Sequence, residues 1–285
     1  TAARTTRFEI VGGTLSVLGQ SLSGNFSVGR DGVSGDLVIS ASAVQAWLGG
    51  ATSGVGILGA SGTVVVGATG VAASLSGTVQ LNVPGVSFSS ALRLDLNTGA
   101  AVDTTVSAFG SSTRLVLAAG PYIRLSGTAA SLTIGGVAVV ADVSIERRRT
   151  VAGTPVTTVA ISNASLTLSA GATTIVRVTD GEGVFVVDAT STAGRLSATV
   201  SVTVPGGAVS IGGSFAVEVN TGSRQVLASV VVGDRVVDID VAAGAVLRVV
   251  ATGATVTAFG TSLHGDVLVE RVRTPGADST AGTDD

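Results

Sequence analysis

Apolar and polar residues alternate along several stretches of the chain. In residues 71–83 the odd-numbered positions are Val, Ala or Leu except for Gly77, and the even-numbered positions are Ala, Ser, Thr, Gln or Asn. Residues 194–204 show the same alternation. A period of two residues is typical of a β-strand with one face against a core and the other in water. The sequence therefore predicts amphipathic strands whose apolar side chains, including Leu75 and Leu196, face a buried core.

Proline and glycine mark the ends of these predicted strands. Pro84-Gly85 ends the first one, because proline lacks a backbone N–H for strand pairing and glycine tolerates a turn. A second alternating segment follows, and Asn97-Thr98-Gly99 closes it as a hairpin-type turn. The series recurs at Pro205-Gly206 and Asn220-Thr221-Gly222. Such short links join antiparallel strands.

The pattern predicts an all-β protein. We find no window with the 3.6-residue period of an amphipathic helix. Residues 46–63 are poorly patterned and rich in glycine, so we expect a loop or short strands there. The remaining segments are expected to form mostly antiparallel amphipathic strands.

One hairpin pattern occurs three times, at residues 8–30, 125–147 and 249–271. The last two copies align without a gap, so that Leu132 is equivalent to Val256, 124 residues later. The first copy aligns with the second at an offset of 117 residues. These copies divide the chain into repeat units at residues 1–124 and 125–248, followed by a partial third unit at 249–285 with a loop-like tail at 274–285.

Internal repetition predicts how the units are arranged. Tandem units of about 120 residues that follow one another without a linker bury a continuous core when they stack. We therefore expect an elongated β rod, tube or solenoid-like array. A chain of separate immunoglobulin-like sandwiches is the alternative, and it requires a clear boundary between units. The tail is either a disordered acidic segment or a hairpin loop whose returning strand lies in a next unit; the gap-free match of the preceding hairpin favours the loop.

Composition excludes several classes of protein. With 45% hydrophobic and 12% charged residues, the chain is too apolar for a disordered protein. The absence of cysteine excludes disulfides, thiolate catalysis and cysteine-ligated zinc. A net charge of −3 lacks the excess of positive charge that binding to nucleic-acid phosphates requires. The apolar residues alternate and form no run of about 18, so no transmembrane helix is predicted.

The residues that could carry chemistry are few and scattered. His264 is the only histidine, and its aligned position in the previous unit is Val140. Asp238 and Asp240 share one face of a predicted strand, where they could bind a cation or act in acid/base catalysis, but a solvated strand face is the simpler interpretation. Residues 180–183, Asp-Gly-Glu-Gly, are expected to form a turn instead of a calcium loop. We assign no catalytic, cofactor-binding or metal-binding residue and expect no cofactor and no enzymatic activity.

The most consistent charged feature is a cluster at the end of each later hairpin copy. Its members are Glu146-Arg147-Arg148-Arg149 and Glu270-Arg271-Val272-Arg273, and Arg124 and Arg248 also match between units. These residues either contact an anionic partner such as cell-surface polysaccharide, or stay in water and pair with acids on a neighbouring strand. The second interpretation is the simpler one.

Two phrases of the sequence resemble a known style of repeat. Val83-Pro84-Gly85-Val86-Ser87-Phe88 with Asn97-Thr98-Gly99, and the matching phrase from Val204 to Gly222, are similar to the tandem β-repeats of very long bacterial extracellular and adhesin-like surface proteins. The resemblance covers residues 8–274 and carries over no catalytic or binding residue. It implies secretion and a location outside the cell or on its surface.

Two functional hypotheses follow. The first is a structural repeat segment of a giant extracellular bacterial fibre, stalk or adhesin, which associates with further copies of the same repeat or continues end to end. The alternative is an extracellular β-tube or groove that carries lipid or another hydrophobic ligand on an aliphatic inner face.

Overall fold

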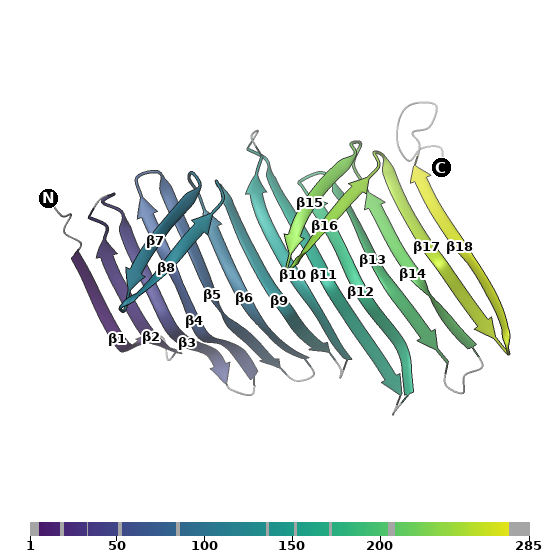
Figure 1. Ribbon diagram of the computed structural model, residues 1–285, viewed down its shortest axis with the longest axis horizontal. Helices are drawn as coiled ribbons and strands as arrows, with labels where there is room; N and C mark the ends of the chain where they lie inside the picture. Colours follow the sequence, from purple (N-terminus) through teal and green to yellow (C-terminus); the bar gives the residue numbers. More distant parts are fainter. Residues whose placement is uncertain are drawn as a thin grey trace. The chain divides into compact units, whose positions relative to one another are not determined.

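The computed structural model describes residues 6–17, 20–32, 34–50, 53–83, 86–134, 137–150, 153–170, 173–204 and 209–273. Within these ranges the chain forms eighteen β-strands and no helix, so no apolar helix of membrane-spanning length occurs there. Fourteen strands lie in antiparallel sheet, and the other four form two separate two-stranded hairpins (Figure 1). The prediction of an all-β, antiparallel fold is confirmed.

The chain folds as two compact units. The first consists of Thr1–Gly135 with Glu146–Arg149, and the second of Gly136–Ile145 with Thr150–Asp285. Each unit contains sheet strands and one of the two-stranded hairpins.

In the first unit the chain runs up and down through consecutive sheet strands and leaves the sheet once. The hairpin made by β7 (Val102–Ala108) and β8 (Ser111–Leu117) interrupts the series and crosses one sheet face (Figure 1). The sheet strands pair in the order β1 (Thr6–Val17), β2 (Gln20–Arg30), β3 (Leu37–Gly50), β4 (Ser53–Gly67), β5 (Gly70–Val83), β6 (Val86–Asn97) and β9 (Tyr122–Ile134).

The second unit also consists of seven sheet strands and one hairpin, but five sheet strands precede the hairpin and two follow it, whereas in the first unit six precede it and one follows. Its hairpin, β15 (Val226–Val232) and β16 (Arg235–Val241), also follows the strand that ends in an Asn-Thr-Gly phrase. The sheet strands are β10 (Val137–Arg149), of which Glu146–Arg149 belongs to the first unit, β11 (Pro155–Ala170), β12 (Thr173–Val187), β13 (Thr192–Thr203), β14 (Val209–Asn220), β17 (Ala245–Ala258) and β18 (Thr261–Arg273).

The strands predicted from alternation are present. β5 and β6 pair without a register shift and bring Leu75 opposite Leu94. β13 and β14 also pair without a shift, and Leu196 lies opposite Val217. The Pro84-Gly85 and Pro205-Gly206 turns and the tail at 274–285 lie outside the described residues.

Two predictions about local structure are wrong. Of residues 46–63, expected to form a loop or short strands, 46–50 belong to the long strand β3 and 53–63 to the long strand β4, because neighbouring strands supply their backbone hydrogen bonds, and 51–52 lie outside the described residues. The turn expected at residues 180–183 is a bulge inside β12, where Asp180 has a φ of 54° and the register with β13 shifts between Thr179 and Glu182. A bulge takes up an extra residue without ending the strand.

Bulges of this kind recur in both units. Positive φ values occur in mid-strand at Ala43 in β3, Ala129 in β9 and Asn163 in β11, next to register shifts in the pairing of those strands. The left-handed conformation is uncommon for residues other than glycine, and paired strands on both sides are what hold it.

The Asn-Thr-Gly phrases do not form the predicted hairpin turns between neighbouring sheet strands. Asn97 is 1% exposed, and its side-chain amide donates to the carbonyls of Ala100 and Ala118, both at 2.7 Å, while its Oδ1 accepts from the N–H of Gly99 at 2.9 Å. Each of these bonds joins the end of β6 to the two chain segments at the base of the β7–β8 hairpin. The asparagine therefore fixes where the chain leaves the sheet and where it returns.

Asn220 does the same in the second unit. It is also 1% exposed, donates to the carbonyls of Arg224 (2.8 Å) and Ala242 (2.7 Å), and accepts from the N–H of Gly222 (2.8 Å). The next residue, Thr221, bonds to the first residue of β13: its Oγ1 accepts a hydrogen bond from the N–H of Thr192 at 2.9 Å.

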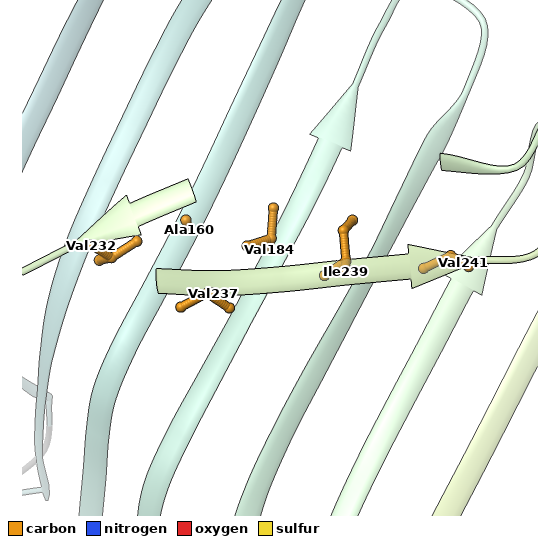
Figure 2. Close-up of a cluster of buried hydrophobic side chains, with 6 residues drawn as sticks. All are labelled: Ala160, Val184, Val232, Val237, Ile239 and Val241. Carbon is orange, nitrogen blue, oxygen red and sulfur yellow. The ribbon is translucent and has the colours of Figure 1, made fainter. Parts of the chain in front are cut away.

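The larger buried cluster lies under the second hairpin. Val232, Val237, Ile239 and Val241 project from the hairpin onto Ala160 of β11 and Val184 of β12 (Figure 2). The first hairpin makes a smaller cluster, in which Leu115 and Leu117 pack with Ala72 of β5. Each hairpin thus covers part of one sheet face with its own apolar side.

The turn between β12 and β13 is held by one carboxylate. Asp188 accepts from the backbone N–H groups of Thr190 and Ser191, both at 2.7 Å, and from both of their hydroxyls at 2.9 Å. The hydrogen bond from the Thr190 N–H is the largest cause of a lowered pKa for Asp188, about 2, and the other three bonds add to it.

We predict that Asn220→Ala lowers the free energy of unfolding by about 2–4 kcal/mol, because it removes the three hydrogen bonds that this buried side chain makes at the base of the hairpin. Urea denaturation followed by circular dichroism measures the change. Ser229→Ala, on the exposed outer side of the same hairpin, is the control and should stay within about 0.5 kcal/mol of the parent. A loss for Asn220→Ala no larger than that of the control would contradict the anchoring role.

The Asp188 turn predicts a defined dependence of stability on pH. Because the folded pKa is depressed, the contribution of Asp188 is fully present above the unfolded pKa of about 3.9 and is lost as pH falls from there through about 2. An NMR titration of the side-chain carboxyl should give a midpoint near 2. Asp188→Asn should remove this segment of the pH profile, and a midpoint near 4 in the parent would show that the four hydrogen bonds do not hold the anion.

Candidate functional site

The two faces of each sheet differ sharply in polarity. Residues directly opposite each other in antiparallel strands share a face, so the register can be followed across the sheet as rows of side chains. We call the face that carries the β7–β8 or β15–β16 hairpin the hairpin face, and the opposite one the open face.

On the open face of the first unit, two adjacent rows cross all seven strands without a polar residue. They consist of Phe8, Val28, Ile39, Val64, Ala73, Leu96 and Ile123, and of Ile10, Phe26, Ala41, Gly62, Leu75, Leu94 and Leu125.

The row between them belongs to the hairpin face and is polar throughout. It consists of Glu9, Ser27, Ser40, Thr63, Ser74, Asp95 and Arg124. The sequence pattern of alternating residues has therefore become two chemically distinct surfaces.

The second unit repeats this separation except under its hairpin, where the hairpin-face residues Ala160 and Val184 are apolar. One open-face row consists of Ile161, Gly183, Leu196, Val217, Val249 and Val269, and the next of Val159, Phe185, Gly194, Val219, Leu247 and Arg271. Arg271 is the one charged member, near the end of β18. The neighbouring hairpin-face row carries Ala160, Val184, Arg195, Glu218, Arg248 and Glu270.

The apolar face is the open one, which corrects the prediction that Leu75 and Leu196 face a buried core. Leu75 is 38% exposed and Leu196 is 39% exposed, although both lie on interior strands of their sheets. The hairpins instead cover small residues on the opposite face, such as Ala72 and Ala160. The physical reason is that each hairpin brings its own apolar side chains, and small residues beneath them let the hairpin pack close to the sheet.

Two glycines shape the open face. A Cβ at Gly62 would overlap the Ser74 carbonyl and lie 2.5 Å from Cδ2 of Leu75, and a Cβ at Gly183 would lie 2.6 Å from the Arg195 carbonyl and 3.1 Å from Cδ1 of Leu196. Each leucine therefore lies across the glycine opposite it in the register. Large side chains that lie along the sheet in this way leave a surface of low relief.

Charged residues on the hairpin face of the second unit form a ladder of alternating sign. Glu218, with 12% of its side chain exposed, lies 3.7 Å from Arg195 and 3.2 Å from Arg248, and Arg248 lies 2.7 Å from Glu270. The hydrogen bond to Glu270, with the attraction of that carboxylate and of Glu218, raises the pKa of Arg248. These ion pairs fix side chains that belong to four neighbouring strands.

The first unit contains a related group around Glu146. Arg124 Nε donates to it at 2.7 Å and Arg148 Nε at 2.8 Å, and both guanidinium groups lie over the ring of Tyr122, at 5.4 and 5.8 Å from its centre. Glu146, Arg124 and Arg248 thus pair with charges on a neighbouring strand. Tyr122 was missed in the sequence, where a single tyrosine carries no pattern.

The structure does not assemble the remaining candidate residues into a site. His264 lies on the exposed strand β18, with Nδ1 2.9 Å from Thr255 Oγ1. Asp238 and Asp240 point outward from β16, where Asp240 accepts from Gln225 Nε2 at 2.6 Å. Glu182 lies 3.8 Å from Arg235. In the described ranges, no three His, Asp or Glu side chains are grouped so that they could hold a metal ion.

A cavity of about 610 Å³ lies beside the first hairpin, on the hairpin face. Its wall includes charges of both signs, among them Arg7, Arg30, Asp36 and Asp103, together with Asn97 at the hairpin base. These groups come from β1, β2, the segment before β3, the end of β6 and β7.

Comparison with known proteins adds no family to this description. No protein-family model, curated protein or solved structure matches the chain.

We predict opposite effects for two glycine substitutions on the open face. Gly62→Ala should lower the free energy of unfolding by about 1–3 kcal/mol, because the new Cβ overlaps backbone that cannot move without breaking the register. At Gly265 in β18 a Cβ would meet nothing within 4 Å, so Gly265→Ala should be neutral or stabilising by up to about 1 kcal/mol. Thermal and urea denaturation measure both, and equal effects would show that the contact across Gly62 is unimportant.

Proposed function

We propose that the chain is a structural repeat segment of a very long bacterial protein located outside the cell or on its surface, as part of a fibre, stalk or adhesin. In this proposal, units of about 120 residues continue one another as an elongated array, and the partners are further copies of the same repeat. The role is mechanical, and the chain carries out no catalysis.

The observation that supports the proposal is that both units anchor their crossing hairpin in the same way. Asn97 and Asn220, 123 residues apart, make the same three hydrogen bonds at the base of a crossing hairpin. A module that fixes its own exit and return points can be repeated in series without changing the sheet on which it is built.

The sheet positions in the two units also correspond. Leu75 pairs with Gly62 on one side and an aliphatic residue on the other, and Leu196, 121 residues later, does the same with Gly183. Leu132 lies opposite Phe88, and Val256 lies opposite Ile211. These four side chains are half-exposed on open faces, which supports a shared plan for both units.

A second candidate function, the carriage of lipid, is favoured by the aliphatic open face. Acyl chains bind to surfaces of this composition, and the rows of the first unit offer no charged group that would repel them. It predicts that lipid accompanies the protein, whereas the structural function predicts further protein.

Localisation tests the structural proposal. An antibody raised against the chain should label the outside of intact cells that produce the protein, and protease added to those cells should degrade the labelled material. Electron microscopy of the purified chain should show assemblies larger than single molecules. Labelling that requires lysis of the cells, together with single particles at all protein concentrations, would contradict the proposal.

A further inference from the structure

We propose that the open face is an interface that packs against the open face of a second copy of this chain. The inference rests on the proposed function, because it names the surface by which copies associate. It is specific to the apolar rows through Leu75 and Leu196 and does not involve the strand edges.

The area of the open face is sufficient for a stable interface. Seven strands spaced about 4.8 Å apart span about 34 Å, and about ten paired residues at 3.3 Å each give strands about 33 Å long, so one unit presents about 1,100 Å². Two such faces in contact bury about 2,200 Å² in total. Stable protein interfaces bury roughly 1,200–2,000 Å².

The chemistry of the face is that of the inside of a β-sandwich. The row through Leu75 contains Ile10, Phe26, Leu94 and Leu125, and the row through Leu196 contains Ile161, Val217, Val249 and Val269. Sheets that pack face to face do so about 10 Å apart through interdigitating side chains of this type. The leucines that lie across Gly62 and Gly183 keep the relief low enough for a second sheet to approach.

The distribution of charge permits the face to meet itself. In a two-fold symmetric contact the same surface is used by both copies, so any charge in its centre would face the same charge. The charged ladder of Arg195, Glu218 and Arg248 lies on the opposite face, behind the sheet. Arg271 lies near a strand end, where it stays in water when the centre is buried.

A second copy fits this face better than a lipid. A lipid headgroup needs polar partners beside the apolar surface, and the polar rows here lie on the other side of the sheet. An identical apolar sheet needs none. Lipid is nevertheless a distinct outcome of the experiment below.

The experiment uses the full chain and places a glutamate in the central row of each unit. In Leu75→Glu/Leu196→Glu the replaced side chains are 38% and 39% exposed, so the new carboxylates can reach water in the single molecule, but they would be buried without partners in the proposed interface. The matched control is Ser76→Glu/Thr199→Glu, at exposed positions of the same strands, β5 and β13, on the hairpin face. Circular dichroism checks that each variant keeps its β-structure.

Sedimentation equilibrium measures the association constant. We expect the Leu75→Glu/Leu196→Glu variant to associate on the order of 100-fold or more weakly than the parent, and the control to associate within about threefold of it. If the parent assembles and both variants assemble equally well, the copies meet by strand edges: the open-face proposal is then overturned while the structural function stands. A parent that stays monomeric at every concentration overturns the open-face proposal as well.

A second measurement does not depend on the glutamates being tolerated. The chain has no cysteine, so Leu196→Cys introduces a unique thiol for a nitroxide label, and Thr199→Cys provides the control. On assembly, the label at residue 196 should lose its accessibility to a water-soluble relaxation agent, and the label at 199 should keep it. Mass spectrometry of the purified protein completes the test: co-purifying lipid that is lost in Leu75→Glu/Leu196→Glu, without any change in association, would overturn the proposal in favour of the carrier function.

Discussion

The structure depends on one constraint, the register of antiparallel pairing between neighbouring strands. Because directly opposed residues share a face, a shift of one residue would move every leucine of a strand to the polar side. The row from Ile10 to Leu125 stays apolar across seven strands only because each pairing keeps its parity, even where bulges shift the register. The two surfaces, the ion-pair ladder and the seat of each hairpin all follow from this pairing.

The hairpins show how the chain can leave the sheet and return to it while the strand register is kept. Asn220 satisfies one N–H and two carbonyls at a point where sheet hydrogen bonding stops, and it does so while fully enclosed. Each of these hydrogen bonds contributes about 0.5–1.5 kcal/mol to stability. The side chain thus substitutes for the missing strand neighbour.

The sequence predicts the strands of this protein better than it predicts their surroundings. Alternation around Leu75 and Leu196 is a local property, and both strands are present. Which face is covered is not local, because it depends on where the chain goes after Asn97, and a buried asparagine looks like a turn residue until its partners are known. The bulge at Asp180 was misread for a related reason: a strand can continue through a left-handed residue when neighbours hold both sides, and that information lies outside the segment. Of the charged candidates, Arg248 and Glu270 pair across neighbouring strands, whereas His264 and Asp238 carry no pattern from which a role could be derived.

The way each hairpin is attached has a consequence for how such a chain can diversify. Each hairpin is held at its base by an asparagine and on the sheet by its inward apolar side chains, while its outward side chains lie away from these contacts. That outward side already differs between the units: the first presents the Arg114–Asp103 pair, and the second presents Asp238 and Asp240 beside Leu227 and Val231. The outward residues of each hairpin can therefore be substituted, and the surface chemistry changed, without altering the contacts between the hairpin and the sheet.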